Sequence, residues 1–429
     1  MQATDSDSSA FTPATTAKEK SDFLRQSAWM IFATFAAGAL MWLVHFLNKF
    51  LPKEEYGTLG TLMTSMMLVP TIPLQMVFAQ QTAAAFAKGR QQELAGMVRL
   101  ALACTFGFWL IVALAMVFLR DAIMARWEIA NPAALWVTLA VILASLWTPL
   151  FAGLLQGCQQ FKWLGWIIIL QAVGRIGSAS FLVIGLGARS AGIMAGALIG
   201  CLTGMVLAMW FTRELWLTRG APFDRGQFLR QVIPLALGFT AYQFLLSADT
   251  IFVNAFFDRE QTAYYFTAGT LSRALVWAVG PLVAVMFPKI VHSSIRGEKT
   301  NLLAVTQVGT GVLVAVGAVG LWWLGPVVIR LVYDPTYVAP TLAILPWYAG
   351  AMVPWCLASV VVNNLLAKAD FRVVPWLVAL AAGYALVLIE YHPSVVAVLR
   401  LLGAFCVLLF LVGAWFTWVR KFAPKTASC

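Results

Sequence analysis

The chain has 429 residues, of which 61% are apolar and only 11% are charged. A soluble protein of this length could not bury so much apolar surface, so the composition excludes a water-soluble globular protein and predicts an all-α polytopic membrane protein. The formal net charge of +11 does not indicate nucleic-acid binding, because the basic residues lie in short segments between apolar stretches.

Apolar stretches of about 20 residues, long enough to cross a hydrocarbon core roughly 30 Å thick, recur along the chain. Residues 1–22 are polar, and we expect them to form a disordered tail ahead of an uncleaved first span. The twelve spans that we predict cover residues 27–48, 59–79, 97–119, 134–155, 163–185, 190–211, 230–254, 262–288, 302–324, 340–366, 373–389 and 394–418.

These spans divide the chain into two predicted bundles. An N-terminal six-helix bundle at 23–211 is joined by a cytoplasmic linker at 212–229 to a C-terminal six-helix bundle at 230–418, and residues 419–429 form a second tail. With the N-terminus inside, 19 lysines and arginines flank the spans on the cytoplasmic side and 8 on the other. This bias predicts that both termini are cytoplasmic.

The two halves resemble each other at an offset of about 206–210 residues. The loop after the first span reads Phe50-Leu-Pro-Lys-Glu-Glu-Tyr-Gly57, and the loop after the seventh reads Phe256-Phe-Asp-Arg-Glu-Gln-Thr-Ala263. Phe161-Lys162 after the fourth span likewise corresponds to Phe371-Arg372 after the tenth. Because six spans separate equivalent loops, the copies have the same orientation, and parallel repeats of this kind place a substrate site between two bundles.

The chain lacks the features of an enzyme or a metalloprotein. Its six cysteines and three histidines are scattered without metal-ligand spacing. No loop between the predicted spans is long enough for a soluble catalytic domain, and no glycine motif that cradles phosphate is present. We therefore expect a protein that is not an enzyme and needs no metal or cofactor.

The predicted seventh span carries a polar stripe. Its members recur at spacings of 3 and 4 and are Thr240, Gln243, Ser247, Thr250 and Asn254. Tyr242 and Asp249 flank this stripe. We expect the stripe to line a cavity, although such groups also bond to neighbouring helices as packing contacts. Asp249 either binds a coupling proton or sodium ion or pairs with a cationic side chain.

Arginines deep within apolar spans are the strongest functional signal, because a cation at bilayer depth costs several kcal/mol without a partner, a cavity or a ligand. Arg175 lies near the middle of the fifth span and Arg273 near the middle of the eighth. One face of the eighth span combines Phe266, Gly269, Thr270, Arg273, Trp277 and Gly280. Guanidinium groups keep their charge and grip phosphate oxygens in pairs. Arg25, at the inner end of the first span, either receives the same group or only orients the chain.

Several motifs, in order along the chain, resemble those of one transporter family. They are Glu54-Glu-Tyr-Gly-Thr58, Leu155-Gln-Gly-Cys-Gln-Gln-Phe-Lys162, Ala248-Asp249, Thr262-Ala-Tyr-Tyr-Phe-Thr-Ala-Gly269, Phe287-Pro288-Lys289 and Asn363-Asn-Leu-Leu-Ala-Lys-Ala-Asp-Phe-Arg372. Over residues 23–420 the chain resembles the polysaccharide-transporter (Wzx-type oligosaccharide flippase) branch of the multidrug/oligosaccharidyl-lipid/polysaccharide exporter superfamily, which shares the MATE-like fold. The glutamines in Phe78-Ala-Gln-Gln81 depart from the pattern, because a basic residue is expected there.

The resemblance implies two pseudo-symmetric six-helix bundles around a cationic cavity in a bacterial cell inner membrane. It also implies that the substrate is an undecaprenyl-pyrophosphate-linked oligosaccharide, moved from the inner to the outer leaflet for surface polysaccharide biosynthesis. The residues predicted to bind it are Arg273, Arg175, Arg25, Gln243, Tyr242 and Thr270. Asp249 is the candidate for coupling to H+ or Na+, and a polysaccharide polymerase and glycosyltransferases are candidate partners. The alternatives are a MATE-like ion-coupled exporter of small molecules and a non-transporting assembly partner of polysaccharide synthesis.

Overall fold

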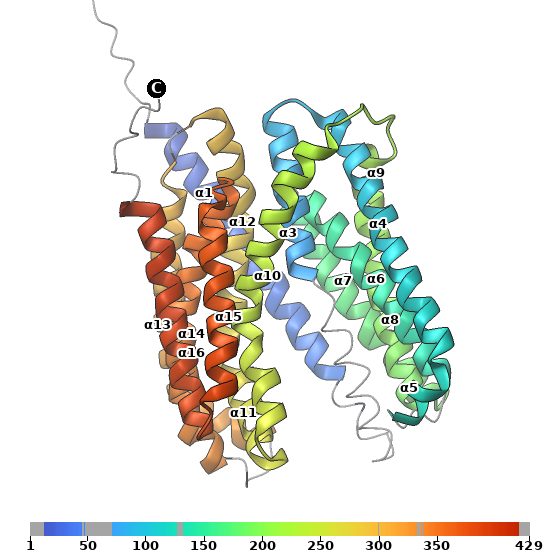
Figure 1. Ribbon diagram of the computed structural model, residues 1–429, viewed down its shortest axis with the longest axis vertical. Helices are drawn as coiled ribbons and strands as arrows, with labels where there is room; N and C mark the ends of the chain where they lie inside the picture. The colour runs from blue at the N-terminus through green and yellow to red at the C-terminus, as the bar shows by residue number, and fades with distance from the viewer. Residues whose placement is uncertain are drawn as a thin grey trace, which may run out of the picture.

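A computed structural model describes residues 13–44, 47, 71–126, 132–298, 300–332, 336 and 338–419 of the chain. Within these ranges the regular structure is entirely helical, without a β-strand. The predicted all-α fold is therefore confirmed. Figure 1 shows the helices in two groups that lie side by side, which we call the N-lobe and the C-lobe.

The N-lobe contains the helices from the first half of the chain. They are α1 (Pro13–Leu43), α3 (Thr71–Ala87), α4 (Gln91–Phe118), the short α5 (Arg120–Arg126), α6 (Pro132–Gly157), α7 (Phe161–Ser180) with a π-helical turn at Phe181–Gly185, and α8 (Arg189–Phe211). A short helix, α9 (Arg213–Trp216), lies in the segment that joins the two lobes.

The C-lobe contains the helices from the second half. They are α10 (Arg225–Phe256), α11 (Arg259–Ser272), α12 (Ala274–Arg296), α13 (Leu302–Val332), α14 (Val338–Ala367) with a 3-10 turn at Phe371–Val373, α15 (Val374–Glu390), and α16 (Val395–Ala414) with a π-helical turn at Trp415–Val419. The predicted domain boundaries at 211, 230 and 418 stay predictions.

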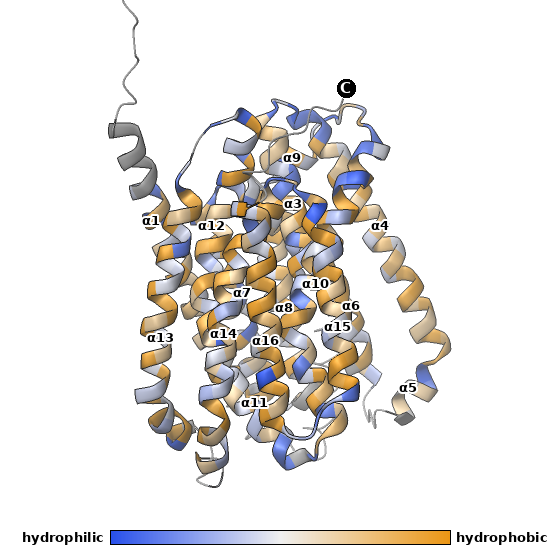
Figure 2. Ribbon diagram, turned by 60° about the vertical axis from the view of Figure 1, so that its left-hand side comes forward, coloured by the Kyte–Doolittle hydropathy of each residue, from blue (hydrophilic) through white to orange (hydrophobic). Residues whose placement is uncertain are grey.

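The helices are long and apolar enough for a membrane protein. Ten candidate spans are found among the described residues, from Gln91–Phe118 to Val395–Val419. Figure 2 shows hydrophobic residues along the outer helices, whereas hydrophilic residues collect at the two ends. On α13, for example, Val308, Val312, Val316 and Val319 are exposed. Apolar side chains on the outside of a bundle fit a lipid surround, so the chain is a multi-pass membrane protein.

One prediction about the elements is wrong. Residues 13–22, expected to be disordered, belong to α1, which continues without a break into the first apolar segment. The predicted eighth span at 262–288 lies within one candidate membrane span, Glu260–Arg296. In it, Arg273 is a single residue between α11, which ends at Ser272, and α12, which begins at Ala274, and Pro281 and Pro288 lie inside α12. Most of the predicted second span lies outside the described residues, and α3 is its described part.

Four tight turns reveal the repeat in the backbone. Gly89 after α3 and Gly297 after α12 have φ of 68° and 71°, and they stand 208 positions apart. Gln159 after α6 and Ala369 after α14 have φ of 58° and 54°, and they stand 210 positions apart. Left-handed backbone is rare for residues other than glycine, so its recurrence at this offset supports the parallel repeat. We call the end of the molecule with these four turns the turn end.

The lobes meet mainly through α1 and α3 of the N-lobe and α10 and α12 of the C-lobe. In the N-lobe α3 packs against α10 and α12 of the C-lobe, and α1 packs against both α7 and α12. Figure 1 shows α10 on the side of the C-lobe that faces the N-lobe. The C-lobe helices α10 and α12 therefore form its side of the boundary between the lobes.

Candidate functional site

Asp249 is the centre of a buried polar cluster in the C-lobe. Its carboxylate has no exposed surface. Tyr265 of α11 and Tyr348 of α14 donate hydroxyl hydrogen bonds to its Oδ2 at 2.6 Å and 2.5 Å. The guanidinium of Arg273 donates to both carboxylate oxygens at 3.0 Å and 3.1 Å. A buried carboxylate requires this kind of compensation, so three helices and the α11–α12 junction are held together at one charged group.

Arg273 lies at the junction between α11 and α12, where the helical hydrogen bonds continue: its N–H donates to the Gly269 carbonyl at 2.9 Å, and its carbonyl accepts from the Trp277 N–H at 3.1 Å. It follows the last residue of α11 and precedes the first of α12. The same terminal nitrogen that bonds Asp249 also donates to the hydroxyl of Thr250 at 2.6 Å and to the carbonyl of Leu246 at 3.1 Å. The guanidinium lies 5.6 Å from the ring centre of Tyr348. Arg273 is therefore anchored on one side by α10 and α14.

The other side of Arg273 is not closed. Its side chain is 24% exposed, although that of Asp249 is 0% exposed. The Nε–H group is buried and has no hydrogen-bond partner. Because guanidinium carries five donors in a planar fork, donors remain for an anion after the bond to Asp249 is made. The arginine is thus paired with a carboxylate but not sealed in a dry core.

Thr270 and Arg273 share an accessible face, as the sequence predicts. Along α11 and α12 this face also includes the exposed Phe266, Trp277 and Gly280. Thr270 is exposed, and its hydroxyl donates to the carbonyl of Phe266 at 2.9 Å. Gly269, predicted on the same face, is instead buried, and a Cβ there would lie 3.1 Å from the Tyr348 hydroxyl.

The polar stripe of α10 lies on the less buried side of that helix. Thr240 and Asn254 at its ends are exposed, whereas Gln243, Ser247 and Thr250 between them are half-buried. Gln243 donates to Ser247 at 3.5 Å. The stripe therefore stays available for contact with a polar substrate, except at Thr250, which is bonded to Arg273.

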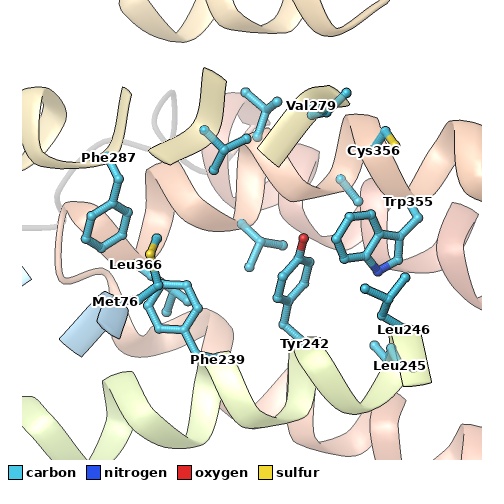
Figure 3. Packing of buried hydrophobic residues seen from close by; sticks show 14 of the residues in the cluster. Met76, Phe239, Tyr242, Leu245, Leu246, Val279, Phe287, Trp355, Cys356 and Leu366 are labelled. Atoms are coloured by element: carbon cyan, nitrogen blue, oxygen red, sulfur yellow. The ribbon is translucent and has the colours of Figure 1, made fainter. Parts of the chain in front are cut away.

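Tyr242 is not placed for such contact. It is 5% exposed and stacks on Trp355 of α14, with ring centres 4.8 Å apart. Figure 3 shows its ring beside Trp355 and among labelled apolar side chains that include Leu246 and Val279. Tyr242 is part of the packed C-lobe core, because its position on the helix is turned away from the stripe.

Arg175 and Arg273 lie in different lobes. Arg175 is on α7 and faces α8, where a Cβ on Gly200 would come within 2.7 Å of the Arg175 Cβ. Gln171, one helical turn earlier, donates to the Cys201 sulfur of α8 at 3.8 Å. The structure therefore places Arg175 within the packing of the N-lobe, and α1 lies between α7 and α12. The joint grip on one phosphate by both arginines stays a prediction.

Arg25 lies on the surface of α1. Its side chain is 79% exposed and pairs with Asp22 at 3.0 Å, one turn earlier on the same helix. An exposed pair of this kind is worth little in stability. The position agrees with the reading in which Arg25 only orients the chain.

A separate pocket of about 690 Å³ lies at the turn end of the N-lobe and contains none of the predicted site residues. Its polar lining includes Gln91, Gln92, Gln160, Thr212, Glu214 and Arg219. Among the residues that the structure describes, no three His, Cys, Asp or Glu side chains gather where a metal ion could bind.

Tyr265 and Tyr348 are functional candidates that the sequence analysis missed. A signal for Tyr265 exists, because it stands 16 positions after Asp249 across the short connection between α10 and α11, so the two face each other in a helical hairpin. Tyr348 is 99 positions from Asp249. Only the packing of α14 against α11 brings it to the site.

Searches against protein-family models and curated proteins find no match. Solved structures do match over nearly the whole chain. A MATE protein in a straight conformation superposes with a TM-score of 0.77 at 14% identity, over 93% of this chain and 95% of its own. A mutant of the MATE transporter VcmN from Vibrio cholerae gives 0.76 at 11% identity, over 95% and 98%.

A third similar structure is a MOP superfamily transporter from Pyrococcus furiosus, described as having a binding pocket whose reversed polarity suggests a different function. It gives a TM-score of 0.74 at 14% identity, over 93% of this chain and 94% of its own. At such identities these likenesses establish the fold alone. The chain has the MATE-like fold.

Proposed function

We propose that this protein is a transporter that moves an anionic, lipid-linked oligosaccharide between the leaflets of a bacterial inner membrane by alternating access. The observation that carries the proposal is Arg273: at the junction between α11 and α12 its side chain is 24% exposed, and its buried Nε–H has no partner. A permanently charged, partly exposed group with spare donors suits a phosphate ligand.

The substrate phosphate would compete with Asp249 for the guanidinium. When Arg273 turns toward a phosphate, the carboxylate keeps the hydroxyls of Tyr265 and Tyr348, at 2.6 Å and 2.5 Å. These two bonds lower the cost of leaving the carboxylate behind. The polar stripe with Gln243, and the exposed Thr270, would contact the glycan, while the isoprenoid tail stays in lipid.

Reconstituted vesicles test this function directly. A fluorescent oligosaccharide on undecaprenyl pyrophosphate is placed in both leaflets, and an irreversible external quencher is added. The loss of the remaining fluorescence over time gives the rate at which molecules move from the inner to the outer leaflet. We expect wild type to equilibrate the leaflets and Arg273→Gln to slow this at least tenfold, whereas the exposed Arg330→Gln serves as the control and stays active. Equal rates for wild type and Arg273→Gln would remove the arginine from the proposal.

The buried carboxylate gives weight to a second candidate, an ion-coupled exporter of small molecules. Asp249 is a fully buried acid, and protonation would weaken its hold on Arg273. Asp249→Asn should abolish the dependence of transport on a proton or sodium gradient. Gradient-driven export of a cationic dye by wild type, without movement of the lipid-linked glycan, would favour this candidate. A polymerase and glycosyltransferases stay proposed partners.

A further inference from the structure

One hydrogen bond crosses between the lobes in their interior. Gln156, the penultimate residue of α6, has no exposed surface. Its side-chain nitrogen donates to the backbone carbonyl of Ala284 in α12 at 3.0 Å. The two residues belong to different lobes and are 128 positions apart.

The carbonyl of Ala284 is open to this bond because of a proline. In an α-helix it would accept from the backbone N–H four residues later, and that residue is Pro288, which has no N–H. The side chain of Gln156 therefore supplies a donor that α12 itself cannot. This hydrogen bond therefore depends on both Pro288 of α12 and Gln156 of α6.

The N-lobe holds this glutamine firmly. Gly153 and Gly157 flank it on α6, and a Cβ on them would come within 2.5 Å of the Gln75 carbonyl and 2.7 Å of the Ala79 carbonyl of α3. The two helices are therefore in backbone contact. Gln75 also donates to the side-chain oxygen of Gln156 at 2.9 Å, which fixes the amide so that its nitrogen points at α12.

We propose that Gln156 and the carbonyl freed by Pro288 form a latch that holds the two lobes together toward the turn end. The inference rests on the proposed alternating access, since only a movement of the lobes apart at this end would break the bond. Separation leaves the Ala284 carbonyl without a partner until water enters, so the unlatched state is penalised. The latch therefore favours the conformation in which the turn end is closed.

The population of open and closed lobes can be measured without any substrate. Spin labels on unnatural amino acids at Lys88 and Ser294, exposed positions in the two lobes, report the distance between the lobes at the turn end in lipid nanodiscs. Gln156→Met keeps the side-chain length but removes the donor. We expect it to raise the ratio of open to closed molecules about two- to tenfold, the effect of one lost hydrogen bond.

Pro288→Ala provides an independent variant. It restores the N–H inside α12, so opening no longer strands the carbonyl, and the open population should rise in the same direction. In the double variant Gln156→Met then adds less than it does alone. Pro281→Ala is the matched control, because it repairs the same helix at the Trp277 carbonyl, which is not bonded to Gln156.

An unchanged distance distribution in both Gln156→Met and Pro288→Ala would overturn the latch, as would strictly additive effects in the double variant. If Gln156→Met fails to fold, the test is the comparison of the open population in Pro288→Ala with that in Pro281→Ala. Because no transport is measured, a protein that moves a different substrate still gives a clear result, and the latch and the proposed function fail separately.

Discussion

Asp249 and Arg273 are stable in the C-lobe only as a pair. The carboxylate is wholly buried, and of its three donors only the guanidinium carries charge. Removal of one partner of a buried ion pair is far more damaging than removal of both, because the remaining charge has no counter-ion. The hydrogen bonds from the tyrosine hydroxyls lower the free-energy cost of leaving the Asp249 carboxylate without its counter-ion, but they do not neutralise its charge.

A double-mutant cycle tests this pairing. Arg273→Gln should destabilise the protein by about 2–4 kcal/mol, somewhat below the usual cost of an orphaned buried charge because Tyr265 and Tyr348 remain bonded to Asp249. Adding Asp249→Asn should recover at least half of that loss. Unfolding in mixed micelles gives the free energies, and a double variant that is less stable than Arg273→Gln alone would contradict the pairing.

At the scale of elements, the contact between α3 and α6 depends on glycine. A Cβ at Gly157 would lie 2.5 Å from the Thr82 Cβ and 2.7 Å from the Ala79 carbonyl. These are rigid atoms, so Gly157→Ala must push the helices apart, and we expect a loss of about 1–3 kcal/mol. Gly177→Ala in α7, which meets nothing within 4 Å, should be neutral or stabilising. Equal midpoints for the two variants in micelle unfolding would rule out the close contact.

In the repeated turns, replacement by glycine is expected to stabilise the protein, whereas replacement of Gly157 is expected to destabilise it. Gln159 and Ala369 adopt left-handed backbone, which glycine adopts without strain. Gln159→Gly and Ala369→Gly should each stabilise the protein by about 0.5–1 kcal/mol, after the added flexibility of the unfolded chain is counted. Gly89→Ala, at another left-handed turn, should destabilise it by a similar amount. Loss of stability in both glycine variants would show that the side chains matter more than the backbone.

Some of these features could be predicted from the sequence and others could not. Hydropathy and charge were enough for the helical fold, and the loop matches placed the repeat at the offset that the turns at Gln159 and Ala369 show. The mid-membrane depth of Arg273 stays a prediction. Its pairing with Asp249 could not be predicted, because it depends on how α10 and α14 pack against the junction of α11 and α12.

Arg175 and Tyr242 also show that the sequence of one helix does not predict which neighbours its side chains contact. Both have the residue type and depth expected of a cavity, but rotation about the helix axis decides what they face. Tyr242 turns into the core toward Trp355, and the Cβ of Arg175 lies against Gly200 of α8. Rotation is set by which neighbours pack where, and periodicity within one helix does not contain that information.

At the scale of the whole molecule, charge is divided between the two ends. Exposed basic residues at the turn end include Lys88, Arg90, Arg219, Arg296 and Arg372, whereas those at the opposite end include Arg120, Arg330 and Arg400. Basic residues are retained on the cytoplasmic side during insertion. The turn end is therefore predicted to be cytoplasmic, and the latch between Gln156 and Ala284 would close the inner face.

Labelling of single cysteines in intact cells tests this orientation. Ser294→Cys at the turn end and Tyr391→Cys at the opposite end are both at exposed positions. A membrane-impermeant maleimide added outside should modify Tyr391→Cys at once and Ser294→Cys only after the membrane is permeabilised. The parent protein, with its native cysteines, gives the background to subtract. The reversed pattern would place the turn end outside the cell. The end with more exposed basic residues would then not be the cytoplasmic one, and the latch would close the outer face.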